Sequence, residues 1–571
     1  MKKKDPLQKL RGSYSTPWKI AEFLAAWAII SPNDRVLEPS CGEGVFLEAT
    51  YHRLRNLGAE VSGIPMRVIG VEIEKIDCDK AEKTLRSTLS GFVKENVQKT
   101  GSGQLTLTQI ESPSPSILNT DFFEFYKENS KAKFDVVIGN PPFIRYQNWK
   151  QDSRSLAFDI VQSAGLKPNR LTNAWVPFVL ASSLMLKPHG RLAMVVPAEL
   201  LQVKYSAQLR LFLSNFFEAI TVLTFKKLIF PEIQEEVVLL LAEKSAPEGN
   251  GIGMIELEDE ASLGGLYPLN SKIALKPVEH TTDKWTQYFL TAKEILFLRK
   301  MRQDLRLKRF GDIAKVDVGV VTGENQFFVV DANILGEFDL SRYTIPIIGR
   351  TAYLEGTTFG LDDLNRIELL GTRCHLLALP EEPITSAASG LLRYLEKGKE
   401  RNVHEGYKCR IRKFWYSVPS IWIPDAFLFR QINLHPRLVL NDTKATVTDT
   451  IHRVKFKSET DPRTAVVCFH NSLTFAFSEV LGRSYGGGVL ELEPNEAEEV
   501  PIPYFDVKIV FNEVDRCLRE NEIGVALEIV DDLVLKEHLG LSTEQVETLR
   551  GVWRKLSRRR TQRRRASNSD A

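Results

Sequence analysis

The sequence lacks the cysteine pattern of a zinc site or of a disulfide framework. Its six cysteines are widely scattered and include no Cys-x-x-Cys pair, which indicates reduced thiols. Cys468 and His470 lie close together, but a structural zinc site needs four ligands. We therefore expect no metal.

Hydrophobic runs long enough to cross a membrane are also missing. No stretch approaches the roughly 18 consecutive apolar residues of a membrane span. The first residues, Met-Lys-Lys-Lys-Asp-Pro, lack the apolar core of a signal peptide. These absences predict a cytoplasmic protein without a membrane partner.

What is present is ordinary globular material. The chain has 571 residues, 43% hydrophobic and 26% charged, enough for two or three domains. The net charge of +2 does not indicate a polyanion partner, but residues 554–565 form a concentrated basic run. We expect residues 551–571 to be a disordered basic tail, which either adds phosphate contacts or is merely solvated.

The pattern along the chain changes near residue 245. Before it, β-rich apolar runs alternate with helical stretches, as in a mostly parallel sheet covered on both faces. A segment rich in Pro, Gly and Asn follows, so we predict one domain over residues 1–245 and a second over 246–550. In the second, β-like runs such as 316–321 and 327–330 mix with helices, and 507–556 look helical. The expected strands of the first domain are 35–38, 67–73, 134–139, 191–196, 220–224 and 237–242, and its helices include 45–56, 77–89, 174–186 and 206–217.

The most informative segment is Phe134-Asp-Val-Val-Ile-Gly-Asn-Pro-Pro-Phe143. Pro141 and Pro142 restrict the backbone, so an apolar strand delivers Asn140 into a rigid turn. The Asn140 side-chain oxygen and the Pro141 carbonyl can then accept hydrogen bonds from one planar amino group, with Phe143 stacked on its ring. This arrangement suits alkylation of an exocyclic nitrogen. The alternative is a core strand that ends at prolines.

A glycine-containing turn, Glu38-Pro39-Ser-Cys-Gly42-Glu-Gly44, follows the first expected strand. Gly42 and Gly44 allow a ligand to approach the backbone closely. The third glycine of the dinucleotide fingerprint is missing, which argues against dinucleotide binding. Glu72 ends the second expected strand, where a carboxylate can accept hydrogen bonds from both ribose hydroxyls.

Asp121 and Phe122 follow a further strand-like stretch. An acid and an aromatic ring there suit an adenine amino group and its ring. A helix N-cap followed by a core residue is the alternative.

The order of these motifs resembles that of S-adenosylmethionine-dependent DNA adenine-N6 methyltransferases. Ser15-Thr16-Pro17 comes first, then the 38–44 turn, Glu72, Asp121-Phe122 and the 140–143 turn, with a further domain last. This order resembles the gamma class of type II restriction-modification systems, whose target-recognition domain is C-terminal. The resemblance implies an α/β fold. A Rossmann-like methyltransferase domain with a mixed, mostly parallel seven-stranded sheet would precede an α+β target-recognition domain.

The resemblance also implies roles for single residues. Thr16 would cap or contact the methionine carboxylate of S-adenosyl-L-methionine, and Glu38 its amino group. Glu72 would bind the ribose. The cofactor adenine would contact Asp121, Phe122 and Phe178, and Phe230 would pack against the target base. For Phe178 and Phe230, core packing is the alternative.

The implied reaction is methylation of adenine N6 in double-stranded DNA, on a base turned out of the duplex, by a monomeric bacterial enzyme that protects host DNA. The hydrogen bonds to Asn140 and Pro141 would build electron density on N6 and allow direct attack on the methyl group. No general base is evident. The family usually has Tyr at the position of Phe143, and Phe keeps the stacking surface.

Candidate DNA contacts lie in the second domain. Lys408, Arg410 and Arg412 alternate with aromatic residues, a mixture typical of nucleic-acid surfaces, although a solvated edge strand is the alternative. Arg483 and Tyr485 flank three glycines that would allow close approach to a phosphate backbone.

Three other functions remain open. Release-factor glutamine methyltransferases use the same clamp, and an RNA substrate or a non-enzymatic DNA-binding module is also possible. The roughly 300 residues after Lys244 favour DNA. A fused restriction nuclease is not expected, because too few residues flank these domains.

Overall fold

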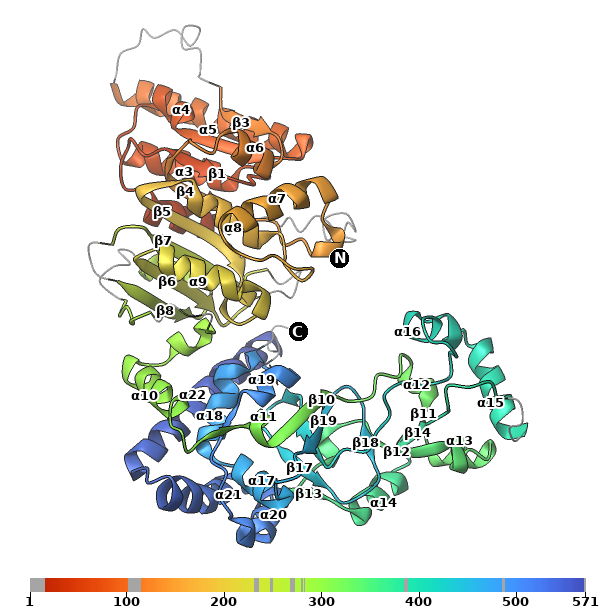
Figure 1. Cartoon of the computed structure of the whole chain (residues 1–571). Coiled ribbons are helices and arrows are strands. Elements are labelled where there is room, and N and C mark those ends of the chain that lie inside the picture. The colour runs from red at the N-terminus through yellow and green to blue at the C-terminus, as the bar shows by residue number, and fades with distance from the viewer. Residues whose placement is uncertain are drawn as a thin grey trace. The chain divides into compact units, whose positions relative to one another are not determined.

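The computed structural model of the chain describes residues 16–100, 114–230, 236–246, 250–266, 273–278, 281, 283–384, 389–484 and 488–568. They form two compact units that divide between Ala292 and Lys293. Figure 1 shows the first unit in red to yellow-green and the second in green to blue. Among the described residues, no helix is both long and apolar enough to cross a membrane.

The first unit is built on one eight-stranded sheet in the order β3-β2-β1-β4-β5-β7-β6-β8. The first five strands in this order are parallel, and β7 runs antiparallel to both of its neighbours. The strands are β1 (Val36–Glu38), β2 (Val68–Glu72), β3 (Ser116–Asn119), β4 (Phe134–Gly139), β5 (Leu186–Pro197), β6 (Ala219–Phe225), β7 (Val237–Glu243) and β8 (Gly251–Leu257).

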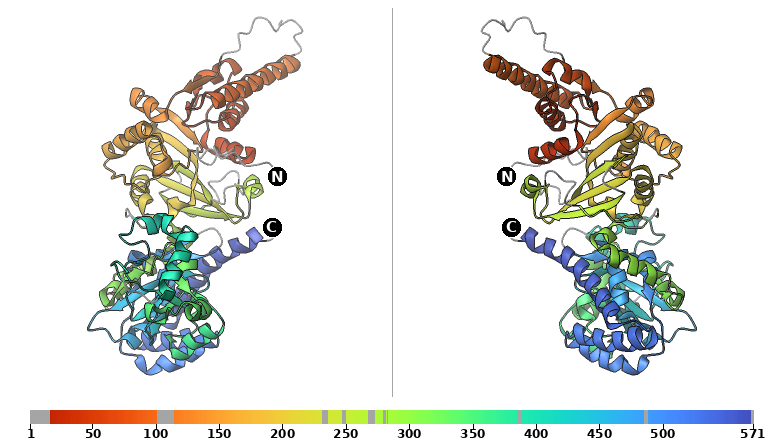
Figure 2. Two further views of the ribbon diagram at one scale, coloured as in Figure 1. Left: turned by 90° about the vertical axis from the view of Figure 1, so that its right-hand side faces the viewer. Right: turned by 90° about the vertical axis from the view of Figure 1, so that its left-hand side faces the viewer.

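Helices cover both faces of this sheet (Figure 2). On one face α2 packs on α3, which packs on α5, and on the other α7 and α8 pack together with α6. Strands β1, β4, β6 and β7 between them are almost fully buried, as expected for a doubly covered sheet. The helices are α2 (Trp18–Ala28), α3 (Val45–Asn56), α4 (Ile64–Arg67), α5 (Lys75–Thr100), α6 (Phe122–Glu128), α7 (Gln151–Ser163), α8 (Trp175–Leu184) and α9 (Ala207–Phe216).

The α/β prediction is confirmed, with two corrections. The sheet has eight strands, not seven, because β8 pairs in parallel with β6 along its whole length. β8 lies beyond the Pro- and Gly-rich segment where the sequence predicts a domain boundary. The boundary at residue 245 is therefore wrong, and the compact units divide at Ala292.

The second unit is α+β, as expected. Its main sheet has five strands in the order β10-β19-β15-β17-β13, and a four-stranded sheet has the order β11-β14-β12-β18. Two smaller sheets are β16-β21-β20 and β22-β9. The strands are β9 (Lys308–Arg309), β10 (Ala314–Val318), β11 (Val329–Val330), β12 (Thr344–Ile348), β13 (Thr358–Phe359), β14 (His375–Leu377), β15 (Ala426–Phe429), β16 (Gln431–Ile432), β17 (Leu438–Asn441), β18 (Thr446–Val447), β19 (Ile451–Phe456), β20 (Arg483–Ser484), β21 (Leu490–Glu491) and β22 (Pro501–Ile502).

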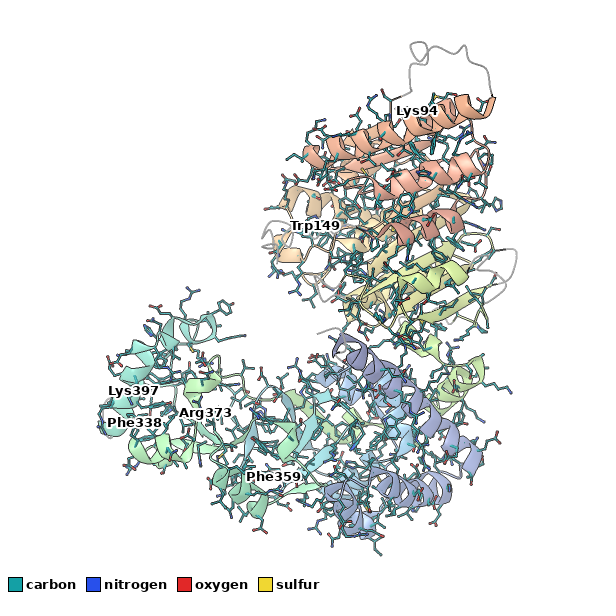
Figure 3. All side chains as sticks on the ribbon, turned by 180° about the vertical axis from the view of Figure 1, so that it is seen from behind. Lys94, Trp149, Phe338, Phe359, Arg373 and Lys397 are labelled. Atoms are coloured by element: carbon teal, nitrogen blue, oxygen red, sulfur yellow. The ribbon has the colours of Figure 1, made fainter. Side chains whose placement is uncertain are left out.

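Around the four-stranded sheet, a separate core gathers Phe327, Phe328, Tyr394 and neighbouring apolar residues. At its edge the Lys397 ammonium lies 4.3 Å from the Phe338 ring centre, and both are labelled in Figure 3. The expected strand 327–330 is partly wrong, since Phe327 and Phe328 end the helical turn α12. The helices are α10 (Ala292–Arg302), α11 (Phe310–Ile313), α12 (Asn325–Phe328), α13 (Ala332–Glu337), α14 (Leu361–Leu369), α15 (Ser389–Glu400), α16 (Tyr407–Arg410), α17 (Pro462–Phe469), α18 (Ser472–Leu481), α19 (Pro494–Glu498), α20 (Phe511–Arg519), α21 (Ile523–Val530) and α22 (Thr543–Asn568).

The expected disordered tail at 551–571 is also corrected. Helix α22 extends to Asn568, and Val552, Trp553 and Leu556 are buried on one side of it. Arg560, only 1% exposed, forms an ion pair with Glu479 at 2.8 Å. Its guanidinium also donates to the carbonyl oxygens of Ile432, Asn433 and Gly488. The basic helix is thus anchored in the second unit.

Candidate functional site

The sequence motifs of the first unit meet at one edge of its sheet. Strands β1 and β4 are parallel neighbours, with Val36 opposite Val136 and Leu37 opposite Val137. In the order β3-β2-β1-β4-β5 the direction of winding reverses between β1 and β4. Ligands of open α/β sheets bind at such a switch point, outside the carboxyl ends of the strands. Glu38 and Asn140 leave the sheet there.

The turn after β1 requires its two glycines. Gly42 has φ +50° and Gly44 φ +90°, conformations that L side chains rarely adopt. A Cβ on Gly44 would also lie 3.0 Å from the Cβ of Ala81. The backbone N–H of Cys41 donates to Val71 O at 2.9 Å, which ties the turn to β2.

Glu72, the last residue of β2, closes one side of this turn. Its Oε2 accepts a hydrogen bond from the N–H of Gly42 at 2.8 Å, and its Oε1 accepts one from the N–H of Glu74 at 3.0 Å. Both bonds fix the plane of the carboxylate. Each oxygen keeps a second lone pair, so the carboxylate can still accept from ribose hydroxyls.

Glu38 has a different environment, because its side chain is buried inside the turn. Its Oε2 accepts no hydrogen bond from any described residue. Burial, and then the neighbouring Glu72 carboxylate, raises the pKa of Glu38 well above its usual value. A buried oxygen without a partner costs free energy unless a ligand supplies a donor. A ligand ammonium group would meet that need.

Asn140 directly follows β4, and its side-chain oxygen Oδ1 is an open acceptor. Its Nδ2 donates to the Thr16 hydroxyl oxygen at 3.1 Å, and the Ser40 hydroxyl donates to its backbone carbonyl at 3.3 Å. Its Oδ1 is buried and, among the described residues, has no hydrogen-bond partner. The turn therefore presents an acceptor that is held in place but unused. No sequence signal pointed to Ser40, whose contact depends on β1 and β4 being neighbours.

Aromatic rings line the neighbouring part of the unit. The rings of Phe122 and Phe178 stack at 5.1 Å with an interplanar angle of 21°, and both are buried. Asp121 caps α6, since its Oδ1 accepts from the N–H of Phe123 at 2.7 Å. Phe143 and Phe230 are 8% and 3% exposed. Burial of these rings fits both core packing and ligand contact.

The basic residues that we singled out in the second unit fall into two groups. Lys408 and Arg410, on the short helix α16, are exposed. Arg412 is engaged internally, because its guanidinium donates to the carbonyls of Val321 and Thr322 and lies 5.4 Å from the centre of the Phe328 ring. Arg483 pairs with Glu496 at 2.8 Å. Tyr485 lies outside the described residues.

The potential metal ligands of the sequence are core residues. The Cys468 thiol donates to Phe505 O, and His470 Nδ1 lies 2.7 Å from Val466 O. Burial lowers the pKa of His470 to about 3. One group that could hold a metal lies elsewhere in the described part of the chain, and it consists of Glu368, Cys374 and His375.

Comparisons with known proteins show which family the chain belongs to. The family model of the Eco57I restriction-modification methylase matches residues 67–230. The model of the C-terminal domain of type II methyltransferase M.Eco57I matches residues 282–535. Together the two matches cover most of both units. The chain belongs to the type II restriction-modification methyltransferases.

Individual type II methyltransferases are similar in sequence to this methyltransferase over most of its length. It is 22% identical to type II methyltransferase M.AccI of Acinetobacter calcoaceticus, over 86% of this chain and 84% of that protein. It is 23% identical to M.HindII of Haemophilus influenzae, over 63% of this chain and 64% of that protein. Among solved structures, the type IIL restriction-modification enzyme MmeI in complex with DNA aligns over 95% of this chain and 75% of its own, with a TM-score of 0.58 and 13% identity. This last likeness shows the shared fold.

Proposed function

We propose that this methyltransferase transfers a methyl group from S-adenosyl-L-methionine to N6 of an adenine turned out of double-stranded DNA, as a gamma-class enzyme of a restriction-modification system. The observation that supports this most is the buried, unpartnered Oδ1 of Asn140 at the switch point of the sheet, where no described residue donates to it. A rigid acceptor without a donor in this part of the protein suits an amino group that arrives with the substrate.

The residues at the strand ends fit the proposed cofactor. The open Oε2 of Glu38 suits the ammonium group of the methionine moiety, and the fixed carboxylate of Glu72 suits the ribose hydroxyls. Pro39, Gly42 and Gly44 shape the turn beside them. When bound, the cofactor supplies a methyl group on a positively charged sulfur.

The stacked rings of Phe122 and Phe178 would form a wall for the cofactor adenine. At 5.1 Å between their centres no base fits between the two rings, so the base would lie against them. Asp121 uses one carboxylate oxygen for the cap of α6, and its other oxygen would accept from the adenine amino group.

The 140–143 turn would hold the target base. Turning an adenine out of the duplex costs roughly a few kcal/mol, which stacking on Phe143 and Phe230 would partly offset. The two N6 hydrogens would be accepted by Asn140 Oδ1 and by the Pro141 carbonyl, and Pro142 keeps the turn rigid. These bonds raise the electron density on N6, which makes it a better nucleophile.

No protein base is required for the transfer. The amide of Asn140 does not accept a proton at ordinary pH, so the role of this chain is to orient and polarise N6. The N6 proton would leave to water after the methyl group has transferred.

The second unit would bind the DNA around the target base. Lys408 and Arg410 are exposed and would contact phosphates, which adds affinity without sequence information. Arg412 and Arg483 already have partners inside the unit, so we do not assign phosphates to them.

The test is to express the chain in a methylation-free host and to sequence the genomic DNA for modified bases. N6-methyladenine at one short recurring sequence is expected, and the Asn140→Ala variant should leave most copies of that sequence unmodified. Modified cytosine would contradict the choice of base. Transfer of tritium from labelled cofactor to protein or RNA, but not to duplex DNA, would contradict the choice of substrate.

A further inference from the structure

We infer that Thr16 positions the reactive amide of Asn140. This inference rests on the proposed function, since it concerns the same clamp. The resemblance implies instead that Thr16 contacts the methionine carboxylate. In the structure the Thr16 hydroxyl oxygen accepts a hydrogen bond from Asn140 Nδ2 at 3.1 Å, across 124 residues of sequence.

The place of Thr16 is fixed by the packing that surrounds it. Thr16 is 5% exposed and lies just before α2, whose first turn begins after the extended residue Pro17. Helix α2 buries Ile20, Phe23 and Leu24 and packs on β4 and β5. Helix α2 thus places Thr16 near the end of β4, where Asn140 follows, and the β-branched side chain of Thr16 has few rotamers to choose from.

The bond is formed in one of the two orientations of the amide. Asn140 has one acceptor and one donor group at the end of its side chain. With Nδ2 directed at Thr16, Oδ1 faces the position where it has no partner among the described residues. A half-turn of the amide would present N–H groups to the N6 amino group, donor against donor. In the orientation of the structure, the Thr16 hydroxyl thus holds the amide with its acceptor directed away from Thr16, where it can accept a hydrogen bond from N6.

Ser40 provides a second support with a different target. Its hydroxyl donates to the backbone carbonyl of Asn140 at 3.3 Å, so it holds the main chain and not the amide. This makes Ser40 a matched control for Thr16. Loss of Ser40 removes a contact to the same residue without freeing the amide to rotate.

The experiment compares Thr16→Val, Thr16→Ser and Ser40→Ala with the wild-type chain. Single-turnover methyl transfer to adenine in duplex DNA is measured beside the calorimetric Kd of S-adenosyl-L-methionine. For Thr16→Val, which keeps the shape and loses the hydroxyl, we expect transfer on the order of 100-fold slower with an unchanged Kd. Thr16→Ser should restore most of the rate, and Ser40→Ala should slow transfer less than Thr16→Val.

Two results would overturn this role for Thr16. One is a weaker cofactor Kd in Thr16→Val with an unchanged rate at saturation, which is the result that a carboxylate contact predicts. The other is equal loss of rate in Thr16→Val and Thr16→Ser, because a hydroxyl effect must be rescued by serine. If the wild-type chain transfers no methyl group to adenine, the proposed function fails, and the calorimetric comparison still separates the two roles of Thr16.

Discussion

Two sets of polar side chains in this methyltransferase, one from each unit, have opposite environments. In the first unit, Glu38 Oε2 and Asn140 Oδ1 are buried without partners among the described residues. In the second, the guanidinium groups of Arg412, Arg483 and Arg560 all bind carbonyls or carboxylates of their own unit. A buried acceptor without a partner at a ligand-binding edge can accept from a ligand, whereas a satisfied group stabilises the fold. Residue type alone does not separate these cases.

The largest effect is expected for Arg560, one of the satisfied groups of the second unit. Replacing Arg560 by methionine leaves Glu479 buried without its cation, which should lower the free energy of unfolding by about 3–5 kcal/mol. Urea unfolding followed by circular dichroism measures the change. The double variant Arg560→Met/Glu479→Met is the control, since it removes both charges.

The double variant should recover most of the lost stability, because two apolar side chains can replace a buried ion pair. If the single variant is as stable as the wild type, α22 is not anchored by this pair. Equal loss in both variants would mean that the carbonyls of Ile432, Asn433 and Gly488, and not Glu479, need the guanidinium.

The sequence predicted local elements of the fold but not this ion pair. Strand β4 and helix α3 have the predicted bounds, because apolar runs, prolines and glycines act locally. Arginines dominate residues 554–565, and their density predicts a disordered tail. The partner that orders Arg560 is 81 residues away in the sequence, and only the spacing of Val552, Trp553 and Leu556 signalled a buried helix face.

The candidate site shows the same limit for its contacts. The motifs place Glu38, Glu72 and Asn140 at the ends of expected strands, and the structure brings them to one sheet edge because these strands are parallel neighbours. The contacts of Asn140 with Ser40 and Thr16 span 100 and 124 residues, and no local pattern encodes them. Sequence therefore singled out Glu38, Asn140 and Thr16, but not the contacts that Thr16 and Ser40 make with Asn140.

The next effect concerns Asn140, whose acceptor has no partner among the described residues. Asn140→Ala should slow methyl transfer by about 10²–10³-fold, the usual cost of removing one polarising hydrogen bond. Cofactor binding should stay within about threefold of the wild type by the same reasoning, since no cofactor contact is lost. Tritium transfer and calorimetry give the two values. Loss of cofactor binding in this variant would show that Asn140 belongs to the cofactor site, and the clamp would have to be abandoned.

A smaller effect is expected from the raised pKa of Glu38. A ligand ammonium group requires the carboxylate, so cofactor affinity should rise with pH until Glu38 is ionised, by up to about tenfold per pH unit. Stability of the cofactor-free chain should respond in the opposite sense. The contribution of Glu38 is complete below its usual pKa of 4.5 and is lost as the pH rises through the raised folded value.

Calorimetry between about pH 5 and 8, where folded proteins are usually most stable, checks this trend, with Glu38→Gln as the control. The variant cannot ionise, so its cofactor affinity should be weaker and should not follow the same pH dependence. A wild-type affinity that is flat with pH would mean that the open Oε2 of Glu38 does not face the ammonium group.

The smallest effect tests whether the exposed cations of the second unit differ from the satisfied ones. Lys408→Ala should weaken DNA binding several-fold and lower the slope of log K against log salt by about one, with unchanged thermal stability. Arg412→Ala should instead lower stability and leave the salt dependence of DNA binding unchanged. It leaves the carbonyls of Val321 and Thr322 without their donor, so stability should fall by about 1–3 kcal/mol while the salt slope stays the same. If Arg412→Ala changes the slope as Lys408→Ala does, a partner inside the unit does not prevent an arginine from binding phosphate. The contrast between open and satisfied groups would then hold for the acceptors of the first unit but not for the cations of the second.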